Sequence, residues 1–451
     1  MTRLSSNRWI VAAAGTLGMA VLGTVYSWSL FTQPLIAAFG WSSATATWAF
    51  SLAIFSLGVG ATLGGRWQDR VGPRPVAVTG FALWALGNVL AGLGTARLGA
   101  PWLYATYGVM GGLGLGLGYV TPVSAVTKWF PDRRGLGSGL VVMGFGLGAF
   151  GYSTFLKSWP AFAAVSHQAV EVVAARAHLA PGQPAPALPP EAVALLMSIF
   201  LWSGAVYAVV GIACALLVRN PPPQASAPAA AAGAAPASAL DLPPSQALRT
   251  GRFWALWGML FLDVTAGILF ISSAVPIMRE LTGAAPAAAV AVYGVLALFN
   301  GLGRLVWGAL SDRLGRNLAY VLIFGSQALI FAAVGGVHTL GWVGVLFAVV
   351  LLGYGGGFGV MPSFVADHFG TRSLGVNYGW VLTAWGVGGV VGPIFAATVK
   401  DATGSYAGAL PVIAVMLAAA VLLPVLTRAP GAGPDQRWAH LRPPARRAKA
   451  G

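Results

Sequence analysis

Charged side chains are scarce in this sequence. They make up 8% of the 451 residues, and only 11 residues are acidic. A soluble protein carries about 25% charged residues, so this composition excludes an ordinary soluble domain. Apolar residues reach 57% and the mean hydropathy is +0.76. Apolar runs close to the length that crosses a bilayer recur along the whole chain.

Residues for a disulfide, a metal site or a nucleophilic catalyst are also few. The one cysteine, Cys214, lies in an apolar run, and the five histidines are scattered. The glycine-rich runs at 108–116 and 353–357 follow no strand, and the sequence has no Walker lysine motif. Small residues at this spacing instead let membrane helices approach closely. We therefore expect no cofactor, no metal and no enzymatic activity.

The apolar runs predict an all-α integral membrane protein with twelve transmembrane helices. The first run has no small-residue cleavage site, so we interpret it as a helix and not as a removed signal. The predicted helices cover residues 9–31, 44–65, 75–94, 101–127, 135–157, 191–218, 253–278, 287–311, 318–337, 340–365, 374–400 and 406–427.

The basic residues predict the orientation of these helices. The loops on the side of the two termini hold 20 of the 26 lysines and arginines, and the opposite loops hold 5. This bias places both termini in the cytoplasm and the protein in the cytoplasmic membrane. The excess charge of +15 is spread over many loops and forms no folded basic face, which argues against a nucleic-acid partner.

The chain divides into two six-helix halves at 1–218 and 252–428, with a linker at 219–251 and a tail at 429–451. The linker stretch 226–244 is almost entirely Ala, Pro and Ser, which cannot form a core. The tail has five basic residues, which favours either contact with anionic lipid or a plain unstructured end. The polar loop at 178–190 has no function that we can assign. We expect a monomer.

The two halves share an internal repeat. The segment GRWQDRVGPR at 65–74 follows the second predicted helix, and GALSDRLGRN at 308–317 follows the eighth; 312 minus 69 is 243. Arg133 and Arg372 follow the fourth and tenth helices, and 372 minus 133 is 239. Repeated order at nearly constant spacing indicates duplication.

This repeated loop resembles the signature of the major facilitator superfamily, over the whole length of the chain. The resemblance implies a gating motif, in which an aspartate lies at the N-terminus of a neighbouring helix and pairs with arginine while the cytoplasmic side is closed. Asp69 with Arg70 and Asp312 with Arg313 match those positions. A fixed topology anchor is the alternative role. Pro73 stands where the family usually has arginine in the first copy.

Arg304 is the only charge in the apolar segment 290–310. A guanidinium there keeps its proton and faces lipid only at a high cost. We therefore expect it to face a water-filled cavity and to bind an anion. A single fixed positive charge in a pore favours a carrier of small organic anions.

A narrower resemblance supports this interpretation. The segments YSWS at 26–29 with Gln33-Pro34, NGLGR at 300–304 and GWVLTAWG at 379–386 resemble the oxalate/formate antiporter family, which is related to the monocarboxylate transporters. The family's carboxylate ligand is an arginine that matches Arg304. The oxalate carrier has a second cation in the eleventh helix, but residues 378–393 contain no lysine or arginine, and Trp385 or its neighbour takes that position.

One cation matches one carboxylate, because a second carboxylate would be left uncompensated at low dielectric. We therefore expect a secondary transporter of lactate-like or formate-like monocarboxylates that works by alternating access. An oxalate/formate-type anion antiporter is the first alternative. A transport-inactive membrane sensor of carboxylates is the alternative from another class.

Asp263 is the second charge deep in a predicted helix. Such acids are rare, costly and often able to exchange a proton. It is either a proton carrier, a partner of Arg304, or a structural carboxyl. The resemblance places the proton-linked aspartate of monocarboxylate transporters at Asn300, which cannot titrate, so Asp263 becomes the candidate for proton coupling.

The remaining site candidates are aromatic or polar residues in glycine-rich helices. Aromatic side chains with polar tips are typical of a small-ligand site. The candidates for substrate contact are Tyr26, Tyr119, Tyr354 and Trp385, with Gln33 and Asn300 as weaker ones. The resemblance matches Tyr26 and Tyr119 to substrate-contact positions, whereas each alone is also consistent with packing.

Overall fold

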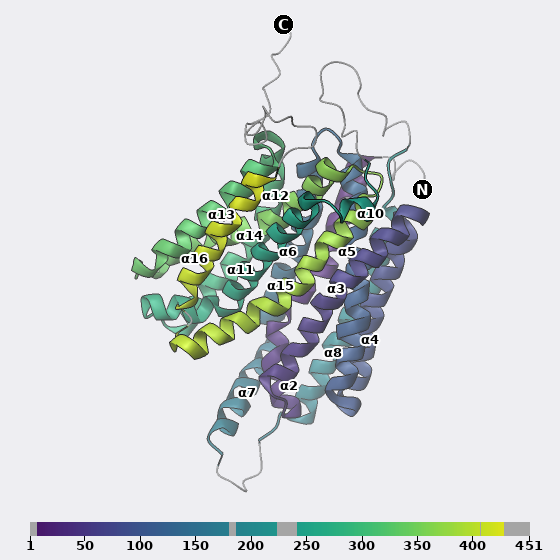
Figure 1. The fold of residues 1–451 in the computed structure, drawn as a ribbon. Helices are drawn as coiled ribbons and strands as arrows, with labels where there is room; N and C mark the ends of the chain where they lie inside the picture. The colour runs from purple at the N-terminus through teal and green to yellow at the C-terminus, as the bar shows by residue number, and fades with distance from the viewer. Residues whose placement is uncertain (1–6, 180–185, 223–240, 406, 428–451) are drawn as a thin grey trace.

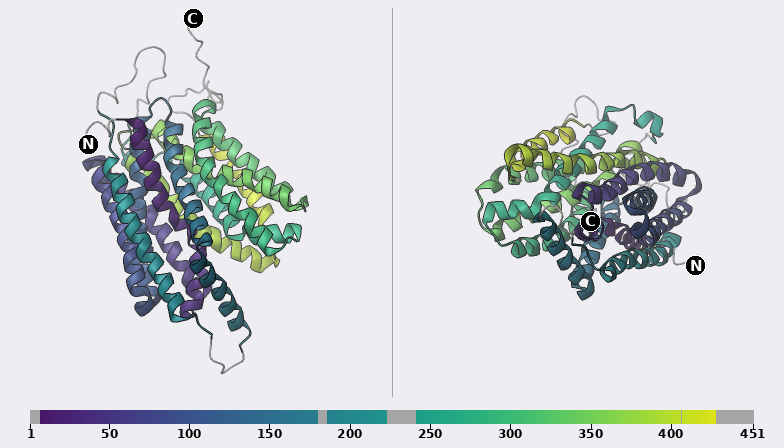
Figure 2. Two further views of the ribbon diagram at one scale, coloured as in Figure 1. Left: turned by 180° about the vertical axis from the view of Figure 1, so that it is seen from behind. Right: turned by 90° about the horizontal axis from the view of Figure 1, so that it is seen from below.

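The structure, a computed structural model, describes residues 7–179, 186–222, 241–405 and 407–427 (Figure 1). Most of the predicted linker and the whole predicted tail lie outside these residues. Within them the chain forms helices, as expected where a bilayer offers the backbone no hydrogen-bond partners. Two bundles of long helices lie side by side, one from each half of the sequence (Figures 1 and 2).

The first half contains the helical elements α1 (Arg8–Gly23), η2 (Thr24–Ser27), α2 (Ser29–Phe39), α3 (Ser43–Val71), α4 (Pro73–Leu103), η3 (Tyr104–Gly111), α5 (Gly112–Trp129), α6 (Arg134–Ser158), α7 (Pro160–Ala177), α8 (Pro190–Val206), η4 (Tyr207–Gly211) and α9 (Ile212–Leu217). The second half contains α10 (Pro244–Ala247), α11 (Gly251–Thr282), α12 (Pro286–Leu314), α13 (Arg316–Ala333), η6 (Val334–Gly336), α14 (Leu340–Phe369), α15 (Leu374–Thr403), α16 (Ala409–Ala420) and α17 (Leu422–Leu426).

The predicted twelve-helix fold is confirmed. Among the described residues, 10 helical stretches are long and apolar enough to cross a membrane. One of them, Pro73–Trp129, reverses at Gly99, where φ is +71°, and its two arms pack antiparallel with Gly80 against Gly118. It therefore holds two crossings. The helix α15, with 30 residues, supplies the remaining one.

Two details differ from the predicted helices. The first crossing extends to Phe39 and is broken by the 3₁₀ turn Thr24–Ser27, so α1 and α2 are separate segments. The helix α7 lies beyond the end of α6, where no helix was predicted, because its sequence is too polar to read as a span. Arg176 holds this extension by donating to the carbonyls of Ile36 and Ala37 at the end of α2, both at 2.8 Å.

The halves contact each other chiefly through α3 against α15 and α6 against α12. These contacts depend on glycine, since a Cβ at Gly139 would overlap the Arg304 carbonyl oxygen and one at Gly65 would overlap the Gly375 carbonyl oxygen. We call the end of the bundle that carries the turns 71–73, 129–134, 314–316 and 369–374 the arginine-rich end. The halves are in close contact there.

Toward the other end the halves separate. Along α6, Gly135 packs on Gly308 and Gly146 packs on Gly301, but a Cβ at Gly151 or at Gly294 would meet no described heavy atom within 4 Å. The ribbons of the two halves diverge in the same direction (Figures 1 and 2). The structure is therefore closed at the arginine-rich end and divergent at the opposite end.

Candidate functional site

Arg304 lies at the interface of the two halves. It is on α12, is 0% exposed, and its backbone packs against α6 of the other half. Its Nη1 donates a long hydrogen bond of 3.5 Å to the Val142 carbonyl. Its Nε and Nη2 have no hydrogen-bond partner among the described residues. Buried guanidinium donors are rarely left unpaired, so this arginine has free capacity for an anion.

Two phenylalanine rings flank the guanidinium. Its carbon lies 5.3 Å from the ring centroid of Phe145 and 4.8 Å from that of Phe358. Cation–π contacts of this kind stabilise a desolvated cation by about 0.5–2 kcal/mol. The two rings come from different halves, on α6 and α14. They hold the positive charge at the interface without neutralising it.

Three predicted aromatic residues complete this arrangement. Trp385 contacts Tyr119, Phe145 and Phe358, with ring centroids 5.2, 5.4 and 4.8 Å apart. Tyr26 lies 5.2 Å from Phe145 and 6.0 Å from Trp385. We call Tyr26, Tyr119, Phe145, Phe358 and Trp385 the aromatic cage.

Further donors in the cage are unpaired. The Tyr119 hydroxyl and the Trp385 Nε1 are buried without a hydrogen-bond partner among the described residues, like Arg304 Nε and Nη2. Tyr119 lies close enough to Arg304 to interact with it electrostatically. Trp385 packs on Tyr119, so these unpaired N–H and O–H groups lie in the same buried region as the guanidinium. Such a region favours an acceptor-rich ligand, and a carboxylate has that chemistry.

Tyr26 and Tyr354 lie at the side of the cage toward the divergent end. Tyr26 is in the turn that breaks the first crossing, and it is partly exposed. Its hydroxyl lies 3.4 Å from that of Tyr354, which is 0% exposed and belongs to the other half. This hydroxyl pair joins the two halves at the edge of the cage.

The two weaker candidates lie farther from the guanidinium. Asn300 is one helical turn before Arg304 and is 8% exposed, and its Oδ1 has no hydrogen bond within the described chain. Gln33 lies on the exposed face of α2, and no described contact joins it to the cage. The structure thus brings Tyr26, Tyr119, Tyr354 and Trp385 together with Arg304, has Asn300 at the margin, and leaves Gln33 outside.

Asp263 does not pair with Arg304. Its carboxylate is 1% exposed, interacts with Arg304 only at longer range, and forms no ion pair among the described residues. It packs instead against Gly357 of α14, near Gln327 of α13. The alternative in which Asp263 pairs with Arg304 is therefore not met in this structure, where α14 packs against the helices of both residues, α11 and α12. Gly357 precedes Phe358 of the cage, so α14 connects the two regions.

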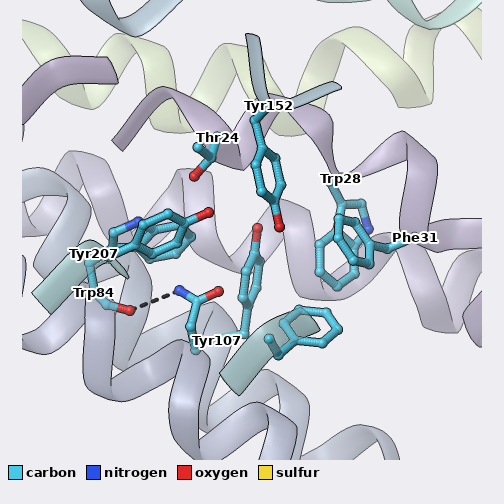
Figure 3. A pocket seen from close by; sticks show the side chains of 9 residues that line it. Thr24, Trp28, Phe31, Trp84, Tyr107, Tyr152 and Tyr207 are labelled. Atoms are coloured by element: carbon cyan, nitrogen blue, oxygen red, sulfur yellow. Dashed lines mark hydrogen bonds between the residues drawn. The ribbon is translucent and has the colours of Figure 1, made fainter. Parts of the chain in front are cut away.

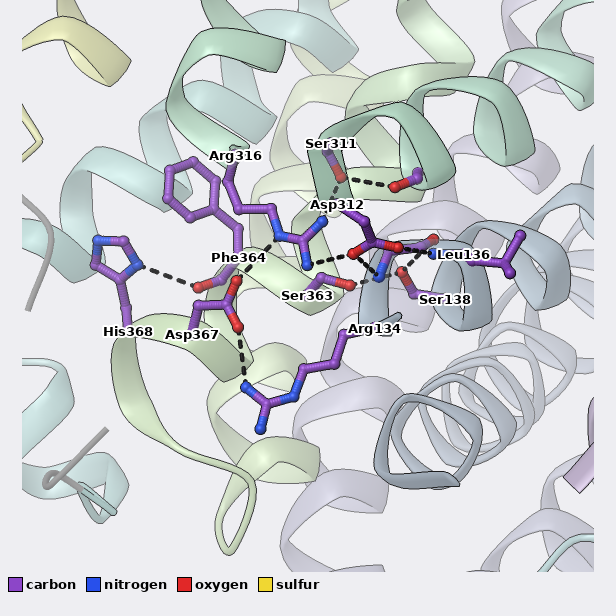
Figure 4. Close-up of polar contacts among 12 residues, drawn as sticks. Arg134, Leu136, Ser138, Ser311, Asp312, Arg316, Ser363, Phe364, Asp367 and His368 are labelled. Atoms are coloured by element: carbon purple, nitrogen blue, oxygen red, sulfur yellow. Dashed lines mark hydrogen bonds and ion pairs between the residues drawn. The ribbon is translucent and has the colours of Figure 1, made fainter. Parts of the chain in front are cut away.

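The second copy of the loop motif forms a network at the arginine-rich end (Figure 4). Asp312 accepts hydrogen bonds from the backbone N–H groups of Gly135 and Leu136, both at 2.8 Å, at the start of α6 in the other half. Arg316 binds Asp312 at 2.8 Å and Asp367 at 3.0 Å. A carboxylate at a helix N-terminus is stabilising, so Asp312 ties the halves together.

The arginine partner of this carboxylate is not the predicted one. Arg313 is exposed and forms no ion pair among the described residues. Adjacent residues on a helix point in different directions, so Arg313 faces away from Asp312. The chain turns at Gly315, where φ is +87°, and Arg316 at the start of α13 meets Asp312. Arg134 of the other half pairs with Asp367 at 2.9 Å.

The first copy follows the same plan with fewer bonds. Asp69 accepts from the Val376 N–H at 3.0 Å, at the start of α15 in the other half. Its cation is Lys128 of α5, whose Nζ lies 3.7 Å from Asp69 Oδ1. Arg70, the predicted partner, is exposed and forms no ion pair within the described residues, for the reason that applies to Arg313.

A separate cavity of about 10 Å³ lies inside the first half (Figure 3). Its walls include Tyr107, Tyr152 and Tyr207, and Thr24 of the broken turn. The volume suits about one water molecule. It contains none of the predicted substrate residues, so it is not the candidate site.

Sequence reasoning missed Phe145 and Phe358. The repeat carried a signal for both: 358 minus 119 is 239 and 385 minus 145 is 240, the spacing that relates the two halves. Tyr119 with Phe358 and Phe145 with Trp385 are thus pairs of equivalent positions. Their side chains all meet at the interface, which makes the cage pseudo-symmetric.

Comparisons with known proteins agree with this architecture. The profile described as Major Facilitator Superfamily matches residues 9–159 and 190–393. The oxalate:formate antiporter of Oxalobacter formigenes is 29% identical over 394 residues, covering 87% of this chain and 84% of that protein. Monocarboxylate transporter 13 of Bos taurus is 25% identical over 427 residues, covering 91% and 87%.

Solved structures share the fold. The Escherichia coli fucose:proton symporter matches with a TM-score of 0.68 at 18% identity, over 93% of this chain and 99% of that one. The human organic anion transporter MFSD10 matches with a TM-score of 0.63 at 16% identity, over 93% and 99%. At these identities the likeness shows the fold alone.

Proposed function

The chain belongs to the major facilitator superfamily, and on that premise we propose that it is a secondary transporter of small monocarboxylates that works by alternating access. It is a multi-pass membrane transporter of the oxalate:formate antiporter and monocarboxylate transporter type. The proposal adds the substrate class, the residues that bind it and the coupling. It also retains the cytoplasmic location of both termini, which rests on the distribution of arginine and lysine.

One observation carries the proposal. Arg304 is fully buried between the halves, and two of its nitrogens lack a partner among the described residues, as do the Tyr119 hydroxyl and the Trp385 Nε1. All four are hydrogen-bond donors. Leaving buried donors unpaired costs about 1–3 kcal/mol each, and a bound carboxylate would remove much of that cost. The guanidinium fork matches the two oxygens of one carboxylate.

The aromatic cage favours a monocarboxylate over oxalate. Residues 378–393 of the eleventh crossing contain no lysine or arginine, and Trp385 lies on the cage in that region. A second carboxylate would meet ring faces instead of a cation. The 29% identity to a protein named oxalate:formate antiporter keeps dianion exchange as the second candidate.

The arrangement of the halves supports alternating access. Both interfaces, α3 with α15 and α6 with α12, are closed from the arginine-rich end to the level of the cage. Beyond Gly146 and Gly301 the halves separate. This is the form expected of a carrier whose site is reached from the divergent end, with the Tyr26 and Tyr354 hydroxyls joining the halves at the edge of the cage. A rocking motion would break the contacts at the arginine-rich end.

Asp263 is the proposed proton-coupling residue. A buried ionised carboxylate without an ion partner is costly, and Asp263 has no ion partner in the described chain. Asp263 packs on Gly357, which precedes Phe358 of the cage, so a change in the protonation of Asp263 could shift α14 and with it the cage. Asp263→Asn should abolish accumulation driven by a pH gradient while exchange of substrate continues. Retained accumulation would make Asp263 a structural carboxyl.

The direct test is uptake into proteoliposomes. Labelled lactate, formate and oxalate are compared with and without a pH gradient, for the natural protein and for Arg304→Lys. The lysine keeps the charge but loses the fork, so uptake should fall about tenfold to a hundredfold. Arg97→Lys, at an exposed arginine, is the matched control.

Two results would contradict the proposal. Normal uptake by Arg304→Lys would remove the role of the fork. Strong inhibition of lactate uptake by oxalate would contradict the argument that a single cation selects a monocarboxylate, and it would favour dianion exchange. Trp385→Lys sharpens the second point, since an added cation in the cage should raise competition by oxalate relative to lactate.

A further inference from the structure

The end of the linker binds the turn between α14 and α15. The Leu242 N–H donates to the Phe369 carbonyl at 3.0 Å, and the Leu242 carbonyl accepts from Asn377 Nδ2 at 3.0 Å. The Asp241 carboxylate accepts from the Arg372 N–H at 3.2 Å. We call Asp241 and Leu242 the linker clip.

The turn is shaped to receive the clip. Gly370 has φ of +80°, a conformation that other residues rarely adopt. A Cβ at this position would overlap the Asp241 carboxylate. Gly370 is therefore required for two reasons: its backbone angle, and the space that Asp241 occupies beside it.

The clip lies next to the first copy of the loop motif. The turn leads into α15, whose Val376 N–H binds Asp69 of the other half. Lys128, which pairs with Asp69, also interacts electrostatically with Asp241. Asp241 is fixed to the second half and Lys128 belongs to the first, so their attraction acts across the interface.

The second copy has an ion pair across the halves in which the signs of the two charges are reversed. There Asp367 of the second half pairs with Arg134 of the first at 2.9 Å. Since 367 minus 128 is 239, Lys128 occupies the position equivalent to Asp367. Lys128 already meets Asp69 of its own half, and Asp241 of the linker adds an acid that is bound to the second half.

We propose that Asp241 is a gating residue, which supplies the cross-half acid of the first motif copy and stabilises the state closed at the arginine-rich end. The inference rests on the proposed alternating access. It assigns a role in gating to the linker, which otherwise only joins the halves.

The test measures opening without transport. Ser138 is 0% exposed between α6 and α14, where it binds the Gly359 carbonyl at 2.8 Å. Ser138→Cys in a Cys214→Ser background therefore reports opening of the arginine-rich end by its rate of reaction with a hydrophilic maleimide. Asp241→Asn keeps an oxygen for the Arg372 N–H but removes the charge. It should speed labelling about two- to fivefold, and Asp241→Ala at least as much.

Matched variants make the result decisive. Asp132→Asn removes an exposed carboxylate from the equivalent turn, where Asp132 pairs with Arg8 of the same half at 3.1 Å, and should leave the rate unchanged. Asp312→Asn should raise it and so validates the reporter. In a Lys128→Met background, Asp241→Asn should have no further effect.

Unchanged labelling in both Asp241 variants, with a rise in Asp312→Asn, would overturn the inference. So would an undiminished effect of Asp241→Asn in the Lys128→Met background. Labelling does not depend on which anion is carried, so a failed uptake assay for monocarboxylates would leave this result intact.

Discussion

The two copies of the loop motif join the halves with different numbers of bonds. In the second copy both oxygens of Asp312 are used, by two backbone N–H groups and by Arg316 at 2.8 Å. In the first copy Asp69 accepts one backbone N–H, and its Oδ1 has no hydrogen bond in the described chain, because Lys128 Nζ is 3.7 Å away. Equivalent loops can therefore carry unequal shares of one closed state.

The difference follows from a few substitutions between the copies. Since 316 minus 73 is 243, Pro73 occupies the position of Arg316, and it cannot supply a cation. Lys128 then provides the charge from α5, where the second copy has Asp367. The first copy thus has its cation on α5, and in the arrangement that we propose its cross-half acid is Asp241 of the linker. The second copy therefore joins two acids and two cations, whereas the first copy has two acids, Asp69 and Asp241, around the single cation Lys128.

The first prediction breaks the stronger copy. Asp312→Asn should destabilise the closed state by about 2 kcal/mol, since charge-assisted bonds to two N–H groups and an arginine are weakened. Asp69→Asn should cost about 1 kcal/mol. With the Ser138→Cys reporter, labelling should rise more than about tenfold for the first and less for the second.

Equal rises for the two aspartates would show that the number of hydrogen bonds does not measure the share of each copy. A larger rise for Asp69→Asn would reverse the comparison. Asparagine is used instead of leucine or alanine because it keeps the volume and one acceptor, so each variant loses the charge and one acceptor oxygen without leaving a cavity.

Much of this fold could be predicted from sequence, because hydropathy and the repeat are local signals. The run lengths gave the crossings, and the repeat located Asp69 and Asp312 at equivalent turns. The pairing of Arg316 with Asp312 and of Lys128 with Asp69 depends on how the helices pack against one another. The sequence motif alone does not contain this information. Adjacency in the motif predicts Arg313, but neighbouring residues on a helix point in different directions, and the turn at Gly315 brings Arg316 to Asp312 instead.

The site shows the same limit. Arg304 could be predicted as a site residue because it is the one charge in an apolar segment. Tyr26, Tyr119 and Trp385 could be predicted because their aromatic rings carry a hydroxyl or an indole N–H. Phe145 and Phe358 have no polar tip and resemble ordinary packing residues. Only the approach of α6 and α14 across the interface places them on the guanidinium, at 5.3 and 4.8 Å. The helix α7 was missed because alanine-rich amphipathic segments outside a membrane lack the apolar signal.

The second prediction removes the cation of each copy. Arg316→Ala should destabilise the closed state by about 1–2 kcal/mol, because Asp312 and Asp367 lose their shared partner while their side chains are 14% and 35% exposed. Lys128→Ala should cost about 1 kcal/mol or less, since its pair is long. Chemical denaturation and Ser138→Cys labelling separate a change in gating from a change in folding. A larger effect for Lys128→Ala would contradict the order.

The last prediction, with the smallest effect, converts the first copy into the second. Pro73→Arg restores a cation four residues after Asp69, and Lys128→Asp restores the acid that Asp367 provides in the other copy. Alone, Lys128→Asp places like charges beside Asp69, and Pro73→Arg places a cation near Lys128, so each should speed labelling of the reporter. Together they should recover about 0.5–1 kcal/mol of coupling, as residues of one charge network do.

The double-mutant cycle is measured in an Asp241→Asn background, because a carboxylate at position 128 would otherwise face Asp241. If the free-energy changes of the two single variants add up to that of the double variant, the two positions are independent. The lysine at 128 would then not compensate for the proline at 73.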